Sequence, residues 1–201
     1  MSKIKNFQQI RTDTEYLYLY RADYETNDET LKYEIVSRKD EATMFDGSSL
    51  GCGTDAVCII PFFDNGDVLA TREFRYAIND YCLEFPAGLI EKGESSADAA
   101  IRELKEETGL DTKKVLFVLP GGFSSAGMTD ENVAIVGLSV TGSFHDVNGK
   151  EEIHSFRTTI PALWERVKKG ESCSCRIQCF LLGTQLRIWK DRHSEPISGT
   201  I

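Results

Sequence analysis

The sequence predicts an α+β fold or an α/β/α sandwich, with a small β-segment before the main domain. Stretches with the composition of β-strands are mixed with three helical patterns along the 201 residues, as expected where helices pack on a sheet. The length suits one domain with its own hydrophobic core and a small appendage. We therefore expect an N-terminal β-segment at residues 1–48 and a main domain at residues 49–201.

The N-terminal segment contains two strand-like stretches. YLYLYRADYE (16–25) and TLKYEIVSRK (30–39) are rich in aromatic and β-branched residues, and a polar TNDE turn separates them. A hairpin or short meander of this size is not stable alone in water. It must pack on the rest of the chain or on a partner subunit, and the Gly/Ser-rich stretch 44–55 is the expected connector.

The main domain begins with a hairpin, because Asn65-Gly66 lies between two strand-like runs. Pro161 and Gly170 are typical of the start and the end of a helix, so they delimit one near the C-terminus. The expected strands are 55–63, 68–76, 81–85, 114–120 and 131–140, and the expected helices are 95–108, 161–169 and 174–190.

Composition excludes several classes of function. The net charge of −9 leaves no basic excess to neutralise the phosphates of a duplex, so we expect no nucleic-acid partner. No apolar run approaches the ~18 residues of a membrane span, and the first ten residues lack the apolar core of a signal peptide. We therefore expect a cytoplasmic protein without a membrane association.

The six cysteines are expected to be reduced, because the chain shows no secretion signal. Cys173, Cys175 and Cys179 form C-x-C-x3-C, which is not a usual zinc spacing. Cys58 and Cys82 lie in apolar stretches and are expected in the core.

The helix at 95–108 has clear boundaries and one apolar face. Ser95 with Asp98 forms a capping-box-like start, and Gly109 is a natural residue after the last turn. The positions that share one face at a spacing of 3.6 residues are expected to be buried: Ala97, Ala100, Ile101, Leu104 and Thr108.

Three glutamates of this helix differ in their surroundings. Glu106 lies toward solvent, with Arg102 one turn before it. Glu103 and Glu107 lie ~40° apart at the edge of the apolar face, with no basic residue at i±3 or i±4. A solvated acidic face is one interpretation. The other is a cation site, because unpaired carboxylates are hard oxygen ligands of the kind that Mg²⁺ prefers.

A longer sequence pattern around this helix favours the cation site over the solvated acidic face. The sequence matches G-x5-E-x7-R-E-U-x-E-E-x-G-U, where U is aliphatic, with Gly88, Glu94, Arg102, Glu103, Leu104, Glu106, Glu107, Gly109 and Leu110. This stretch resembles the Nudix box, the signature of hydrolases that cleave nucleoside diphosphates linked to a further group. The resemblance implies a Nudix fold, an α/β/α sandwich, and a Mg²⁺ cofactor for which Mn²⁺ can substitute.

The resemblance also implies a role for each residue of the box. Glu103 and Glu107 would bind the metal together with the backbone carbonyl of Ala87, and Glu106 would be an auxiliary ligand. Glu94 and Arg102 would form an ion pair that supports the helix, and Gly88 would complete the structural support.

The stretch before the box resembles one branch of the family. Residues 72–95 are similar to the ADP-ribose pyrophosphatases and nucleotide-sugar hydrolases, through Arg75 and the run LEFPAG (83–88). The resemblance implies that Arg75 binds the substrate diphosphate, because a guanidinium matches phosphate oxygens. Arg72, Leu89 and Ser125 are further expected substrate-binding residues.

The branch also implies a homodimer in which the N-terminal segment contributes to the nucleotide pocket. Aromatic side chains of that segment would then be a stacking surface for a base, or would pack within the hairpin. They are Tyr16, Tyr18, Tyr20, Tyr24 and Tyr33.

The general base is expected in the glycine-containing stretch 120–132. The branch carries a glutamate a few residues after an S-P-G segment, and here Glu131 follows Ser125-Ala126-Gly127. Glu151 and Glu152 are the alternatives. Ala126 departs from the proline of the branch and weakens the assignment to ADP-ribose, but not the assignment to hydrolase chemistry.

The sequence thus predicts Mg²⁺-dependent hydrolysis of ADP-ribose or a related nucleoside diphosphate sugar, giving a nucleoside monophosphate and a sugar phosphate. Hydrolysis of a dinucleotide or a coenzyme diphosphate is an alternative. A non-catalytic nucleotide-sugar sensor is a third hypothesis.

Overall fold

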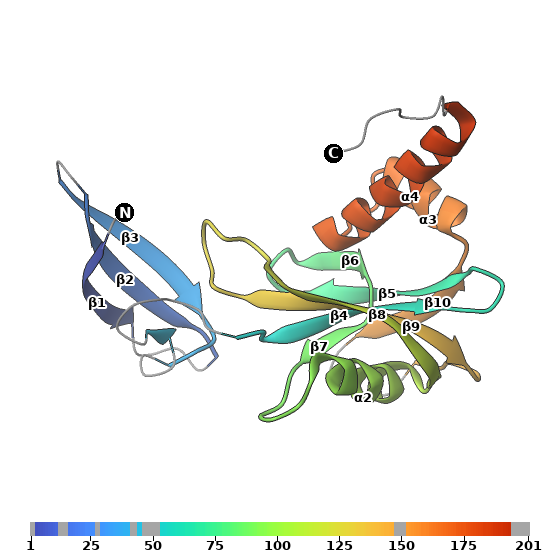
Figure 1. Ribbon diagram of the computed structural model, residues 1–201, viewed down its shortest axis with the longest axis horizontal. Helices are drawn as coiled ribbons and strands as arrows, with labels where there is room; N and C mark the ends of the chain where they lie inside the picture. The colour runs from blue at the N-terminus through green and yellow to red at the C-terminus, as the bar shows by residue number, and fades with distance from the viewer. Residues whose placement is uncertain are drawn as a thin grey trace, which may run out of the picture. The chain divides into compact units, whose positions relative to one another are not determined.

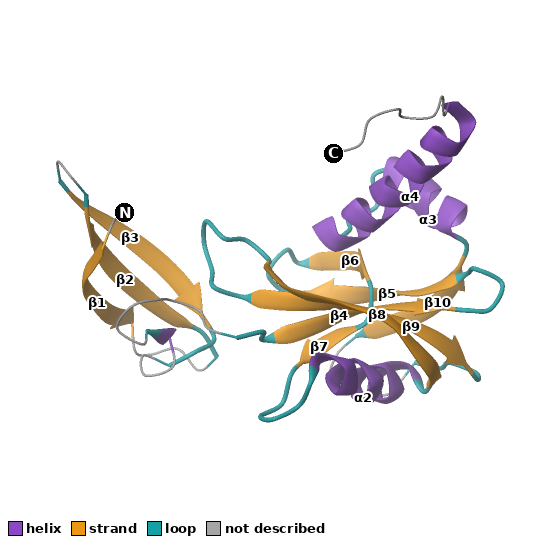
Figure 2. Ribbon diagram, viewed as in Figure 1, coloured by secondary structure: helices purple, strands orange, loops and turns teal. Residues whose placement is uncertain are grey.

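A computed structural model describes residues 3–11, 16–26, 29–40, 44–45, 53–146 and 152–193. The chain divides into two compact units that interleave along the sequence. The first comprises Met1–Cys58, Gly88–Ala99 and Val118–Val136, and the second comprises Ile59–Ala87, Ala100–Phe117 and Gly137–Ile201. Figures 1 and 2 show the elements of both units.

The first unit contains an antiparallel sheet in the order β1-β2-β3, formed by Lys3–Arg11, Tyr18–Glu25 and Thr30–Ser37. Its small core holds Tyr20, Ala22, Ile35 and Met44, and the ring of Phe7 stacks on Tyr20 with centroids 4.9 Å apart. The predicted hairpin is confirmed as β2 and β3. Strand β1 is an addition that its composition did not indicate, because KIKNFQQIR is rich in residue types that are not enriched in strands.

A seven-stranded sheet has the order β10-β5-β4-β9-β8, with β6 paired to β5 and β7 paired to β4. Its strands are β4 (Ala56–Phe62), β5 (Val68–Arg75), β6 (Asp80–Glu84), β7 (Ala87–Leu89), β8 (Asp111–Phe123), β9 (Asn132–Thr141) and β10 (Ile153–Thr158). The predicted hairpin is confirmed: β4 pairs antiparallel with β5. The left-handed φ of 85° at Gly66 makes its turn possible.

Three helices have described bounds: α2 (Ser96–Thr108), α3 (Ile160–Lys168) and α4 (Cys175–His193). Each lies within a few residues of its predicted range. Thr159 caps α3, with its Oγ1 accepting a hydrogen bond from the Ala162 N–H at 3.2 Å. Within the second unit, α3 and α4 lie on one side of the strands and the C-terminal part of α2 lies on the other (Figure 1).

The core of the second unit consists of aliphatic side chains from strands and helices, which confirms the predicted α+β class. Fully or almost fully buried members are Ile59, Leu69, Leu83, Leu104, Leu110, Leu138, Leu163, Ile177 and Leu181. The predicted boundary between residues 48 and 49 falls on residues outside the described ranges, as does most of the predicted connector.

Two expectations from composition can be compared with the structure. Five described cysteines form no disulfide, and the first two are buried as expected: Cys58, Cys82, Cys173, Cys175 and Cys179. Cys52 lies outside the described residues. Over the described part of the chain, no helix is both long enough and apolar enough to cross a membrane.

Candidate active site

Helix α2 is fixed at both ends in the way that its sequence predicts. The Ser95 hydroxyl accepts the Asp98 N–H at 3.2 Å and lies 2.6 Å from the Asp98 carboxylate, which confirms the cap. Gly109 follows the last turn with φ 76°, a conformation that favours glycine. The box glutamates are therefore carried on a helix with defined ends.

The apolar face of α2 is mostly the predicted one. Ala100, Leu104 and Thr108 are fully buried. Ala97 is only half-buried, and Ile101 is 37% exposed. The prediction for Ile101 is wrong because the buried face of the helix is displaced toward Ala99, which is fully buried and was not predicted.

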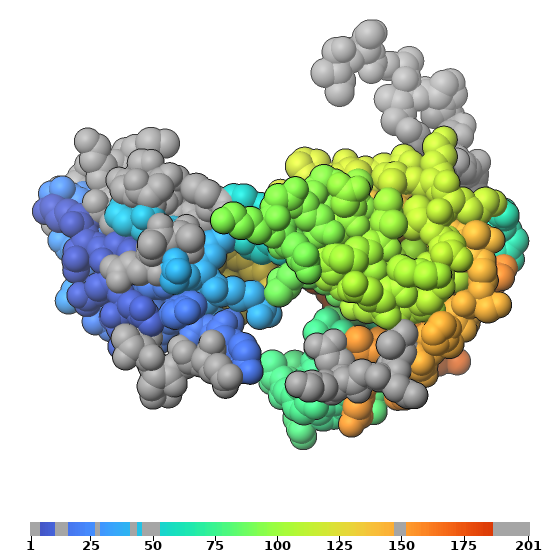
Figure 3. Space-filling view, turned by 90° about the horizontal axis from the view of Figure 1, so that it is seen from below, coloured from blue at the N-terminus to red at the C-terminus, as the bar shows by residue number. Residues whose placement is uncertain are grey.

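The three glutamates differ in burial as predicted. The side chain of Glu103 is 15% exposed and that of Glu106 is 61% exposed, while Glu107 is half-buried. Figure 3 is viewed from below Figure 1 and shows the α2 segment, in green to yellow-green, at the molecular surface. Glu103 and Glu107 thus stand at the margin between core and solvent, where a ligand can reach them.

The expected charge pairing of these glutamates needs a correction. Arg102 Nη1 donates to Glu106 Oε2 at 3.2 Å, as predicted, and also to Glu103 Oε1 at 2.8 Å. The prediction that Glu103 has no basic partner is wrong, because the guanidinium reaches its immediate neighbour as well as the next turn. Glu107 also takes part in a polar or electrostatic interaction. A lack of basic partners for Glu103 and Glu107 is therefore not an argument for a cation site.

The donor chemistry of α2 nevertheless fits a hard divalent cation. Three carboxylates lie within five positions of one helix, and oxygen ligands suit Mg²⁺ or Mn²⁺. Across the described ranges, no three His, Cys, Asp or Glu side chains are grouped closely enough to hold a metal. A cation that binds Glu103 must therefore displace Arg102 from its 2.8 Å contact with Oε1 or share the carboxylate with it.

The expected site and support residues that precede α2 lie in and after β7. Ala87, whose carbonyl is the expected ligand, is half-buried beside Gly88. Glu94 accepts a hydrogen bond from the Glu91 N–H at 3.0 Å, which closes the turn before α2. The expected Glu94–Arg102 ion pair stays a prediction.

Arg75, the expected ligand of the diphosphate, is bound to carboxylates on β5 and β6. Its Nε donates to Glu84 Oε2 at 3.1 Å, its Nη2 contacts the same oxygen, and its Nη1 lies 2.5 Å from Glu73 Oε1. Burial alone lowers the pKa of Arg75, but the hydrogen bond to Glu84 and the charges of both glutamates raise it overall. The guanidinium is thus a fixed cation.

The other expected substrate residues have separate surroundings. Arg72 Nε lies 3.4 Å from Glu171 Oε1, and its guanidinium lies 4.8 Å from the centre of the Tyr81 ring. Leu89 is 53% exposed. Ser125 is exposed, and its carbonyl accepts the N–H groups of Met128 and Thr129 at 2.9 and 3.0 Å.

Glu131, the expected base, closes the loop between β8 and β9. Its carbonyl accepts the Ser124 N–H at 3.0 Å, and its N–H donates to Thr129 Oγ1 at 3.2 Å. Its carboxylate lies 3.7 Å from Arg38 Nε. The alternative Glu152 accepts the Tyr81 hydroxyl at 2.6 Å, and Glu151 lies outside the described residues.

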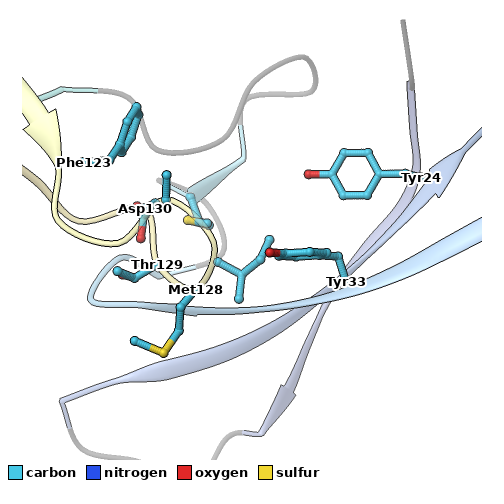
Figure 4. Close-up of a pocket in the computed structure, with 9 residues that line it drawn as sticks. Tyr24, Tyr33, Phe123, Met128, Thr129 and Asp130 are labelled. Atoms are coloured by element: carbon cyan, nitrogen blue, oxygen red, sulfur yellow. The ribbon is translucent and has the colours of Figure 1, made fainter.

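A cavity in the first unit is lined by Tyr24 and Tyr33, two of the tyrosines that the sequence offered as a stacking surface, but its second wall was not predicted. It has a volume of about 200 Å³, and residues of the N-terminal sheet and of the loop 123–130 line it together. Figure 4 shows Tyr24 and Tyr33 on one side, and Phe123, Thr129 and Asp130 on the other. Side chains alternate between the two faces along β3, so Tyr33 and Ile35 lie on the same face. No sequence signal predicts that they lie near a loop about ninety residues away.

Comparison with known proteins identifies the family. The family model described as "NUDIX domain" matches residues 54–168, which is more than half of the chain. The box residues 88–110 lie inside this range. An uncharacterized Nudix hydrolase of Schizosaccharomyces pombe is 32% identical over 63% of this chain and 67% of its own length. An ADP-ribose pyrophosphatase of Bacillus subtilis is 31% identical over 58% of this chain and 64% of its own length.

A solved structure agrees on the fold. The crystal structure of an ADP compounds hydrolase superposes with a TM-score of 0.69 at 22% identity, covering 94% of each chain. These comparisons agree with the predicted fold and with pyrophosphohydrolase as the predicted class of enzyme. The match of more than half of the sequence, with the complete box inside it, shows that the chain belongs to the Nudix family.

Proposed function

We propose that this chain hydrolyses the diphosphate bond of ADP-ribose or a related nucleoside diphosphate sugar. The products are a nucleoside monophosphate and a sugar phosphate. The observation that carries the proposal is the complete box on α2 within the matched range 54–168. The likeness to a Bacillus subtilis protein named ADP-ribose pyrophosphatase supports this substrate class.

The carboxylates of α2 are the proposed metal ligands. Glu103 and Glu107 would hold a divalent ion, Mg²⁺ or Mn²⁺, with the carbonyl of Ala87, and Glu106 would act as the auxiliary ligand. Such an ion neutralises charge on the diphosphate and lowers the pKa of an attacking water. The half-buried margin of α2 suits this role, because it keeps Glu103 partly shielded at 15% exposure while ligands can still approach.

Other residues are proposed to accept the proton and to bind the substrate. Glu131 would accept a proton from the attacking water as the general base. Arg75 would supply positive charge to the diphosphate, and its contacts with Glu84 and Glu73 hold the guanidinium in one orientation. Arg72, Leu89 and Ser125 would complete the contacts with the substrate.

We further propose a homodimer in the cytoplasm. The small core of the N-terminal sheet supports a need for a further packing surface. The five described cysteines form no disulfide, which fits a reducing compartment.

The proposed function is tested by a substrate panel. Purified chain with Mg²⁺ is incubated with ADP-ribose, ADP-glucose, GDP-mannose, a flavin dinucleotide and a diadenosine polyphosphate, and the products are separated by ion-exchange chromatography. We expect turnover of ADP-ribose or another nucleotide sugar to exceed that of the dinucleotides by at least ~10-fold in kcat/KM.

Two outcomes contradict the proposal. Faster turnover of a dinucleotide or flavin would assign the chain to that substrate class. Binding of a nucleotide sugar, measured by calorimetry, without turnover of any member of the panel would favour the sensor.

A further inference from the structure

The loop that carries Glu131 is attached to the C-terminal part of β3. The Val36 N–H donates to the Met128 carbonyl at 3.0 Å, and Val36 forms an isolated parallel bridge with Thr129. The Tyr33 hydroxyl donates to the Gly127 carbonyl at 2.6 Å, and Figure 4 shows Tyr33 directed toward this loop. These bonds hold the backbone before Glu131 but do not reach Glu131 itself.

Lys39 supplies the attachment next to the candidate base. Its Nζ lies 2.8 Å from Asp130 Oδ2 and 2.7 Å from Asp55 Oδ1. The side chains of Lys39 and Asp130 are only 15% and 6% exposed. One ammonium thus joins two carboxylates in a place with little access to water, where charge pairs are screened less than at the surface.

The second carboxylate fixes the other side of Glu131. Asp55 Oδ2 accepts the Asn132 N–H at 2.8 Å, and the Asp55 N–H donates to the Asn132 carbonyl at 2.8 Å. The residues immediately before and after Glu131 are therefore connected through Lys39 and Asp55. This arrangement limits the movement of the Glu131 backbone from both directions.

The charge of Lys39 is stabilised in this position. Burial lowers the pKa of Lys39, but the hydrogen bonds to Asp130 and Asp55 outweigh this and raise the pKa above its ordinary value. The ammonium therefore stays protonated at neutral pH. Arg38, by contrast, is 55% exposed and lies 3.7 Å from Glu131, a contact that solvent weakens.

We propose that Lys39 is a positioning residue: its ion pairs with Asp130 and Asp55 hold the loop 124–131 so that Glu131 is placed for catalysis. This inference rests on the proposed function, because it gives Glu131 the role of the base. The ammonium of Lys39 contacts Asp130 and Asp55, and neither carboxylate is proposed to react. Its effect on the reaction passes through the loop.

The test replaces Lys39 and measures both the reaction and the loop. Lys39→Met keeps an unbranched side chain of similar length and removes its charge, and Lys39→Arg keeps the charge. Lys32→Met is the matched control, because Lys32 lies on β3, the strand that precedes Lys39, and its side chain is exposed. Steady-state kinetics on the best substrate of the panel is combined with hydrogen exchange of residues 124–131 in the full chain.

We expect Lys39→Met to lower kcat by at least ~10-fold with KM within about threefold, because a misplaced base affects the chemical step rather than binding. Exchange of the loop amides should accelerate by at least ~10-fold. Lys39→Arg should restore kcat to within about threefold, and Lys32→Met should match wild type. Asp130→Asn, which is nearly isosteric, should give a partial loss and serves as a second variant if Lys39→Met does not fold.

Two results would overturn the proposal. One is a kcat for Lys39→Met within twofold of wild type, and the other is unchanged exchange of the loop in that variant. If the wild-type chain hydrolyses nothing in the panel, the proposed function fails and with it the catalytic part of this inference. The exchange measurement then still decides whether Lys39 holds the loop.

Discussion

Arg102 contacts two glutamates of the box with a single guanidinium, so its one positive charge is shared between two carboxylates. Its Nη1 contacts Glu103 at 2.8 Å and Glu106 at 3.2 Å. Because these contacts are charge-assisted, they compete with a cation for the same oxygens. A metal bound through Glu103 must therefore displace or share one of them, whereas Glu106 has an exposed carboxylate that can reach a cation through water.

Among single residues of the box, Glu107 allows the most direct prediction. We expect Glu107→Gln to lower kcat by at least ~100-fold, because the substitution removes a charged metal ligand at nearly constant shape. Glu106→Gln is the comparison and should lower kcat less, since the auxiliary ligand is more exposed. Both are measured by steady-state kinetics at saturating Mg²⁺, with circular dichroism as a check on folding. A Glu107→Gln activity within threefold of wild type would show that Glu107 is not a ligand.

Strands β8 and β9 flank the loop that carries Glu131. In this strand pair, the backbone of Gly121 lies very close to the side chain of Asn132. A Cβ at Gly121 would overlap the Asn132 side-chain amide and lie 2.8 Å from Thr54 Oγ1. A Cβ at the next residue, Gly122, would meet nothing within 4 Å. A larger residue at position 121 therefore requires the side chain of Asn132 to move.

These neighbouring glycines provide a matched pair of variants. We expect Gly121→Ala to destabilise the fold by about 1–3 kcal/mol, because Asn132 must move to admit a methyl group. Gly122→Ala should change stability by less than about 0.5 kcal/mol. The free energy of unfolding is measured by urea denaturation with intrinsic fluorescence. Equal effects of the two substitutions would mean that the contact with Asn132 does not constrain the strand pair.

At the scale of the whole molecule, features encoded by local patterns were predictable and long-range pairings were not. The capping box at Ser95, the Asn65-Gly66 turn and the helix of the box each depend on residues close in sequence. Asp130, the partner of Lys39, is 91 positions away. No spacing of residues in the sequence indicates that the two side chains pair. Strand β1 was missed because its pairing with β2 outweighs a composition that does not favour strands.

The same division applies to the candidate site. The box predicts which glutamates lie at the margin of α2, because burial follows the helical period. It does not predict that Arg102 reaches Glu103, or that Arg75 is held by Glu73 and Glu84. Long flexible side chains select partners by the local packing, which periodicity does not determine.

The central claim is cleavage of a diphosphate that depends on a divalent metal. Phosphorus NMR of ADP-ribose with the purified chain tests it most directly, because the bond that breaks is observed itself. We expect the diphosphate signals to be replaced by the phosphomonoester signals of AMP and ribose 5-phosphate when Mg²⁺ is present, and to persist after chelation with EDTA. An unchanged diphosphate spectrum with folded protein and saturating Mg²⁺ would contradict the account.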